Sequence, residues 1–180
     1  GIFEGKAFKG HLITSVIEHK AVVDPAKWLE SKGVEVTWLE PDDKGIISVE
    51  KVQAAIKSNT VLVSLMMVNN ETGAVNPIAE ISQVCQDSDI LLHVDAAQAL
   101  GKIPVKLSEL PVDLLSLSAH KFYGPKGVGA LFVRREVTAL LKSQIHGGGH
   151  ERGMRSGTLA THQLVGLGEA ARIVAEGLSE

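Results

Sequence analysis

The sequence predicts a single α/β domain with a mostly parallel sheet and helices on both of its faces. Apolar runs of strand length alternate along the 180 residues with amphipathic segments of helical period. The runs are apolar at consecutive positions, as strands buried on both faces require, and 44% of residues are hydrophobic against 22% charged. No repeat, low-complexity tract or linker divides the chain, so we expect one domain over residues 1–180.

The first half of the chain contains three expected strands and two expected helices. The strands cover residues 11–15, 34–39 and 61–68, and the helices cover residues 20–32 and 49–57. Gly33 is a favoured residue just beyond a helix C-terminus, so it marks the end of the first helix. Pro25 lies inside that helical pattern, and we expect it to sit near a kink or to mark the true start of the helix.

The second half continues the alternation. The expected strands cover residues 90–94, 114–117 and 129–134, and the expected helices begin at Pro77 and cover residues 161–178. Residues 118–128 alone join the last two strands, whereas a parallel crossover needs a dozen or more residues and usually a helix. We therefore expect the strand at 129–134 to be antiparallel to its neighbour.

Charge and composition limit the partners of the chain. The net charge is −3 and no block of Lys or Arg occurs, which argues against nucleic acid as the main partner. No apolar run approaches the roughly 18 residues of a membrane span, and no signal peptide is recognisable. Cys85 is the single cysteine, which excludes an internal disulfide and suits a reducing compartment. We expect a cytoplasmic protein, or one of the mitochondrial matrix if the source is eukaryotic.

Three features that could be mistaken for reactive sites are better interpreted as structure. Cys85 shares one helical face with Ile78 and Ile81, which favours a buried structural thiol over a nucleophile. The GPKGVG turn at 124–129 precedes a strand instead of opening a helix, so it is neither a dinucleotide loop nor a P-loop. The histidines of HGGGHE at 146–151 lack a third ligand and a fixed backbone, so we expect no metal there.

Polar residues follow three of the expected strands and form the candidate site. They are Asn70 after residues 61–68, Asp95 and Gln98 after residues 90–94, and Ser118, His120 and Lys121 after residues 114–117. The carboxyl ends of parallel strands line the ligand crevice of such a sheet. A lysine delivered by a buried strand can be partly desolvated, which favours the neutral amine that forms a Schiff base with an aldehyde. Taken alone, Lys121 would be an ordinary surface lysine, but a lysine and a carboxylate converging on one ligand suit pyridoxal phosphate.

A further anion site is expected near the C-terminal helix. Ser156, Gly157 and Thr158 offer N–H and hydroxyl donors just before that helix, and Arg152 and Arg155 supply positive charge. The three consecutive glycines before them allow the backbone to come close to a cofactor or to a neighbouring subunit.

Five motifs in order extend this interpretation over nearly the whole chain. They are IEHKAV at 17–22, VNNETG at 68–73, HVDAAQALGK at 93–102, SAHKFYGPKGVGAL at 118–131 and HGGGHERGMRSGT at 146–158. With them the sequence closely resembles the cysteine desulfurases of the NifS/IscS type, in the class V aminotransferase superfamily. The last motif is the most specific of the five. The resemblance implies the large domain of a fold type I transferase, with pyridoxal 5′-phosphate as cofactor. The implied reaction removes sulfur from L-cysteine, giving alanine and an enzyme persulfide for iron–sulfur cluster assembly or another sulfur-transfer pathway.

The resemblance also assigns roles to residues. Lys121 would hold the cofactor as a Schiff base and move the proton of the substrate's α-carbon, and His19 would stack on the pyridine ring and assist that transfer. Asp95 would keep the pyridine nitrogen protonated. Asn70 and Gln98 match family residues that contact the ring hydroxyl and the substrate side of the cofactor. Ser118 and His120 match residues that bind the cofactor phosphate. Thr158 matches a threonine that reaches the cofactor phosphate of the other subunit. The last match implies a homodimer.

Cysteine desulfurases are much longer than this chain, so the resemblance implies the central part of the large domain. The N-terminal segment and the C-terminal small domain would lie outside it. With them would lie the family's N-terminal phosphate-binding threonine, the arginine for the substrate carboxylate and the cysteine that carries sulfur. We therefore expect the isolated piece to be inactive, and the sulfur acceptor, an iron–sulfur scaffold or another protein, stays open.

Two alternatives remain at this stage. Another class V enzyme, such as an aminotransferase, a selenocysteine lyase or a kynureninase-like lyase, would share Lys121 and Asp95 without the persulfide step. A non-catalytic truncated module, retained for dimerisation or binding, would give a preparation without the yellow colour that borohydride bleaches.

Overall fold

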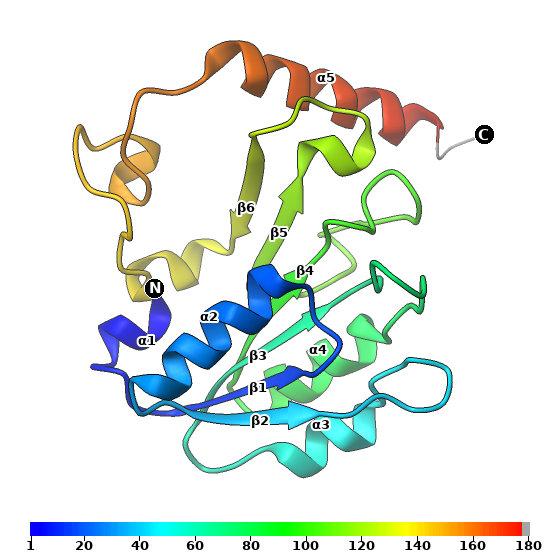
Figure 1. The fold of residues 1–180 in the computed structure, drawn as a ribbon, viewed down its shortest axis with the longest axis vertical. Coiled ribbons are helices and arrows are strands. Elements are labelled where there is room, and N and C mark those ends of the chain that lie inside the picture. The colour runs from blue at the N-terminus through cyan, green and yellow to red at the C-terminus, as the bar shows by residue number, and fades with distance from the viewer. Residues whose placement is uncertain (178–180) are drawn as a thin grey trace.

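The computed structural model describes residues 1–177 and is built on one six-stranded sheet (Figure 1). The strand order is β2-β1-β3-β4-β5-β6. The strands are β1 (His11–Ser15), β2 (Glu35–Leu39), β3 (Thr60–Met66), β4 (Leu91–Asp95), β5 (Leu114–Ser118) and β6 (Gly129–Val133). The first five are parallel, and β6 is antiparallel to β5. The predicted mostly parallel sheet and its one antiparallel strand are both confirmed.

Helices connect β1, β2, β3 and β4 in turn, as expected for parallel crossovers, whereas residues 96–113 join β4 to β5 without a helix. The α-helices are α1 (Ile2–Gly5), α2 (Lys20–Ser31), α3 (Val49–Ala55), α4 (Ile78–Asp87) and α5 (Thr161–Gly177), and the 3₁₀ turns are η1 (Ala119–Phe122), η2 (Arg135–Leu140) and η3 (Glu151–Gly153). The helix α1 and the three turns were not predicted, because elements this short show no period. Leu178, the predicted end of the last helix, lies outside the described residues.

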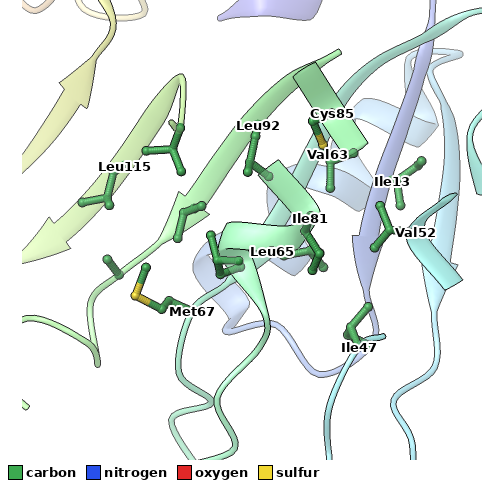
Figure 2. Packing of buried hydrophobic residues seen from close by; sticks show 14 of the residues in the cluster. Ile13, Ile47, Val52, Val63, Leu65, Met67, Ile81, Cys85, Leu92 and Leu115 are labelled. Atoms are coloured by element: carbon green, nitrogen blue, oxygen red, sulfur yellow. The ribbon is translucent and has the colours of Figure 1, made fainter. Parts of the chain in front are cut away.

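The two faces of the sheet pack against different helices. Leu12 lies in a cluster with Ala26 of α2, whereas its neighbour Ile13 lies in a larger cluster with Val52 of α3 and Ile81 of α4. Consecutive strand residues point to opposite faces, so α2 covers one face and α3 and α4 cover the other. Figure 2 shows the larger cluster between the strands and these helices. Helices on both faces were predicted and are present.

Helix α2 corrects the expectation about Pro25. The helix begins at Lys20 and continues to Ser31 with Pro25 inside it, so Pro25 does not mark the start. The true N-cap is His19, whose ring nitrogen Nδ1 accepts a hydrogen bond from the backbone N–H of Ala21 at 3.1 Å. A proline in a helix removes one backbone donor, and packing of Ala26 against the sheet compensates for that loss.

The sheet has its topological switch point between β1 and β3. From β1 the chain goes to β2 on one side, and then back to β3 on the other side. The backbone pairing of β1 with β3 runs from His11 to Ile13, where Ile13 pairs with Val63. Beyond that point the two strands share no further backbone pairs. Ligands of open α/β sheets bind at the carboxyl ends of strands beside such a switch point.

The turn from β5 to β6 reverses the chain at the carboxyl edge. A Cβ at Gly129 would lie 2.5 Å from the backbone oxygen of Leu117, so the close approach of the two strands requires glycine there.

After β6 the chain reaches α1, where the N-terminal amine of Gly1 donates to the carbonyl of Lys142 at 2.7 Å. None of the helices in residues 1–177 combines the length and the apolar character that crossing a membrane requires.

Candidate active site

Three strands deliver predicted site residues to the same edge of the sheet. His19 follows β1, Asp95 is the last residue of β4, Ser118 is the last residue of β5, and Lys121 lies in η1 directly after it. Since β1, β4 and β5 are parallel, their ends lie at the carboxyl edge. Asp95 and Ser116 are register partners, which brings the end of β4 next to the strand that leads to Lys121.

Lys121 is presented by a tight turn. The N–H of Gly124 donates to the carbonyl of Ala119 at 2.9 Å, and Tyr123 adopts a left-handed conformation with φ 68°. The side chain of Lys121 is exposed, so the residues described here do not provide the expected partial desolvation. Its amine forms no ion pair within residues 1–177, and it is therefore free to react with a carbonyl ligand.

Asp95 is half-buried and has one carboxylate oxygen in use. Oδ1 accepts a hydrogen bond from the backbone N–H of Ala97 at 2.9 Å, and this bond fixes the side chain at the end of β4. The backbone carbonyl of Asp95 accepts from Met67 N–H at 2.9 Å, which ties β4 to β3 at the same level. Within the described part of the chain the other oxygen takes no hydrogen bond, so it can accept one from a cationic ligand.

His19 is exposed beside the switch point, and its hydrogen bond determines its tautomer. Because Nδ1 accepts from Ala21 N–H, the proton of the neutral ring is on Nε2. Two further predicted residues lie close together after β5, since Ser118 Oγ and His120 Nδ1 are 3.0 Å apart. A hydroxyl and an imidazole side by side offer donors for an anion.

Three predicted residues are not brought into this group. Gln98 is half-buried, and its side-chain oxygen accepts a hydrogen bond from Lys102 Nζ. Asn70 is exposed, and its neighbour Asn69 instead organises the loop by accepting from Glu71 N–H and Thr72 N–H at 2.9 Å each. Thr158 lies on an exposed segment that is anchored elsewhere.

The anchor of the Thr158 segment is at Ser156. Its backbone N–H donates to the carbonyl of Ile145 at 3.1 Å, on the chain that follows β6 away from the carboxyl edge. Gly157 N–H donates to His150 Nδ1 at 3.3 Å. Thr158 therefore follows a segment that is tied to the chain after β6.

Two titratable residues of the site, half-buried His93 and buried Glu18, were given no role on the sequence. His93 lies on the same face of β4 as Asp95, with Ser64 Oγ 2.8 Å from Nδ1 and Ser116 Oγ 3.2 Å from Nε2. Burial lowers its pKa, against the opposing effect of the Asp95 charge. Glu18 is 7% exposed and joins the ends of β1 and β3. The signal for both was present, because each is polar and adjoins a predicted site residue in the motifs IEHKAV and HVDAAQ.

Cys85 is a buried residue of α4, as predicted. It is 1% exposed and packs in the larger core cluster, to which Val63 and Leu92 also belong (Figure 2). Burial raises the pKa of its thiol to about 12, and the negative charge of Asp113 acts in the same direction. A thiol that stays protonated and inaccessible is not a nucleophile.

The donors at the carboxyl edge fit pyridoxal phosphate. The free oxygen of Asp95 suits a protonated pyridine nitrogen, and the unpaired amine of Lys121 suits an aldehyde. Ser118 and His120 offer donors to a phosphate. In residues 1–177 no group of three or more His, Cys, Asp or Glu side chains is arranged to hold a metal ion.

Comparisons with known proteins agree with this geometry. The aminotransferase class-V family model matches residues 4–180. The cysteine desulfurase IscS of Aeromonas salmonicida (strain A449) is 57% identical over 180 residues, which are 99% of this chain and 45% of that protein. A solved NifS-like protein superposes with a TM-score of 0.94 at 41% identity, covering 99% of this chain and 49% of that one. A structure of SspA in complex with cysteine gives a TM-score of 0.90 at 48% identity, covering 94% and 50%. The chain thus spans about half the length of the relatives it matches.

Proposed function

Because the chain belongs to the class-V aminotransferase family, we propose that it is the cofactor-binding part of a pyridoxal-phosphate-dependent cysteine desulfurase. The observation that carries the proposal is the placement of Asp95 and Lys121 at the ends of the adjacent parallel strands β4 and β5. The likeness to IscS and to SspA in complex with cysteine supports L-cysteine as the substrate. The products would be alanine and a persulfide sulfur.

Pyridoxal phosphate, when bound, supplies an electron sink for the substrate's α-carbon. The ε-amine of Lys121 would hold the aldehyde carbon and, once released, carry the proton from the α-carbon. The free oxygen of Asp95 would accept the pyridine N–H in a charge-assisted hydrogen bond, which keeps that nitrogen cationic. His19 would stack on the ring and, with its proton on Nε2, assist proton transfer at the substrate.

The other predicted ligands complete the proposal. Ser118 and His120 would bind the phosphate, and Asn70 and Gln98 would contact the ring hydroxyl and the substrate side. Gln98 would have to exchange its hydrogen bond with Lys102 for one with the ligand. Thr158 would reach the phosphate of a second copy in a homodimer, since within one copy it is tied to Ile145 through Ser156.

The thiolate that attacks the substrate's sulfur must come from outside the described fold. Cys85 is the single cysteine of the sequence, and it is buried and protonated at neutral pH. We therefore assign the complete desulfuration to the longer protein that contains this chain, as its central large-domain part, and regard the chain by itself as inactive. We further propose a cytoplasmic protein, or one of the mitochondrial matrix in a eukaryote. Its persulfide would pass to an iron–sulfur scaffold or another acceptor protein.

The test is covalent trapping of the cofactor. The natural protein is loaded with pyridoxal phosphate, reduced with borohydride, digested and mapped by mass spectrometry. We expect the label on Lys121, its loss in Lys121→Arg, and its retention in Lys102→Arg, a control lysine that lies next to the same strand ends. Label on Lys102 or Lys126 instead would refute the assignment. With an added dithiol that reduces the persulfide, alanine and sulfide formed from cysteine in equal amounts would distinguish a desulfurase from an aminotransferase of the same family.

A further inference from the structure

The seam between β1 and β3 is held by side chains where the backbone pairing ends. Beyond the pair of Ile13 and Val63, Thr14 Oγ1 donates to the carbonyl of Ser64 at 2.9 Å. Four residues further along the chain, Glu18 Oε1 accepts a hydrogen bond from Met66 N–H at 3.0 Å. Met66 is the register partner of Asp95. The Glu18 side chain thus links β1 to β3 beyond their last backbone pair, where the ligand crevice of such a sheet opens.

The carboxyl of Glu18 is buried, and its two oxygens differ in their hydrogen bonding. Oε1 accepts from both Ser15 Oγ at 2.7 Å and Met66 N–H, and these donors are the last residues of β1 and β3. Oε2 is buried and has no hydrogen-bond partner among the described residues. An ionised carboxylate with one bare, buried oxygen is costly, whereas the acid form places its proton on that oxygen. Burial, aided by the charge of Asp95, raises the pKa of Glu18 to about 7 against the lowering effect of the two hydrogen bonds.

Glu18 also ties the loop that carries His19 to the end of β3. The two residues are adjacent in the loop between β1 and α2, and this loop has one more tie to β3, from Asn69 Nδ2 to the carbonyl of Ile17 at 3.0 Å. His19 itself caps α2 through its Nδ1. The Glu18 side chain is thus the tie to β3 that lies next to His19, between the bond at Ile17 and the start of α2.

We propose, resting on the function proposed above, that Glu18 is a positioning residue that acts as the neutral acid to hold the His19 loop against the end of β3, beside Asp95. Neutrality keeps a second negative charge away from Asp95 and leaves the pairing of Asp95 with a cationic ligand undisturbed. Length matters as well, since the carboxyl must reach Ser15 and Met66 together.

The test compares three substitutions that separate length from charge. Glu18→Gln keeps the length and is neutral, Glu18→Asp keeps the acid but is one methylene shorter, and Glu18→Ala removes both. In the natural protein, stripped of cofactor, the affinity for added pyridoxal phosphate is measured by absorbance titration. We expect Glu18→Gln to bind within about twofold of the wild type, and Glu18→Asp and Glu18→Ala to bind at least about tenfold more weakly, as the loss of two hydrogen bonds implies. Glu30→Gln, an exposed acid on α2, is the matched control.

The outcomes distinguish this proposal from the one it rests on. If the wild type does not bind pyridoxal phosphate, the proposed function fails. If the wild type binds pyridoxal phosphate and Glu18→Ala binds it equally well, the positioning role is refuted while the proposed function stands. The same conclusion follows if Glu18→Asp keeps the wild-type affinity and Glu18→Gln loses it. Should Glu18→Ala not fold, as judged by circular dichroism, Ser15→Ala replaces it. That variant removes one donor to the carboxyl and is expected to weaken binding several-fold, and unchanged affinity would overturn the proposal.

Discussion

Replacing Glu18 by Gln should remove a specific part of the pH dependence of stability. The pKa of Glu18 is raised from 4.5 to about 7 by burial, and the charge of Asp95 adds to the effect. Asp95 is the charged group of the described residues whose field acts on it, and the groups that contact it, Ser15 Oγ and Met66 N–H, are neutral. In the folded protein the carboxyl thus keeps its proton over a range in which the unfolded chain has lost it.

The sign and the size of the effect follow from this difference in bound protons. Below pH 4.5 both states are protonated and the stabilisation is complete, and it is lost as the pH rises through about 7. At about 1.4 kcal/mol per pKa unit, the free energy of unfolding falls by about 3 kcal/mol over this range. The neutral amide of Glu18→Gln has no such dependence. The quantity to compare is therefore the wild-type free energy of unfolding minus that of the variant, at each pH.

This subtraction is necessary because two histidines act in the opposite direction. Burial lowers the pKa of His11 and of His93, so the unfolded chain binds more protons at these residues and their contribution to stability grows as the pH rises through 6.5. They are the same in both proteins and cancel in the difference. Any fixed cost of burying the amide shifts the difference by a constant amount and leaves its pH dependence unchanged.

The assay is urea unfolding of the cofactor-free protein at half-unit steps from pH 4 to pH 8, because urea carries no charge. We expect the difference to fall by about 3 kcal/mol, centred between pH 5 and pH 7. Glu30→Gln, measured in parallel, should show no such fall. A difference for Glu18→Gln that stays constant within about 0.5 kcal/mol would mean that Glu18 is already ionised in the folded protein, and the reasoning from its bare oxygen would be wrong.

Three further substitutions test the site, the turn that supports it and, as a control for that turn, an open position in α5. Asp95→Asn should keep the cofactor bound but lower kcat by roughly 100-fold in the natural protein, since the amide preserves the shape and loses the charge; near-normal turnover would make Asp95 an ordinary strand-end residue. Gly129→Ala should cost at least about 2 kcal/mol in the free energy of unfolding, because its Cβ would lie 2.5 Å from the Leu117 oxygen. Gly168→Ala in α5 meets nothing within 4 Å and should stabilise by about 0.5–1 kcal/mol; equal effects at the two positions would contradict the steric argument.

Much of the fold could be predicted because its signals are local. The apolar runs identified all six strands to within one or two residues, and the short connection before Gly129 gave the direction of β6. Of the two alternatives for Pro25, the start of the helix is excluded, because α2 already begins at Lys20, where a histidine cap replaces the usual signals.

The site could be predicted in part. The edge at which His19, Asp95 and Lys121 gather followed from the parallel strands. The roles of Glu18 and His93 did not follow, because each depends on hydrogen-bond partners on other strands. A sequence pattern shows which residues end a strand, but it does not show which neighbouring strand supplies a donor.

The strand β6 has a practical consequence. It forms one outer edge of the sheet, its sequence GALFV has neither charge nor proline, and its first three residues are exposed. The opposite edge, β2, begins with Glu35, which pairs with Lys57 at 2.6 Å. Natural proteins protect edges with charges, prolines or covering segments, because an open edge is a template for intermolecular pairing. When this chain is prepared alone, aggregation would start at β6, and Leu131 is the position at which an introduced lysine would oppose it.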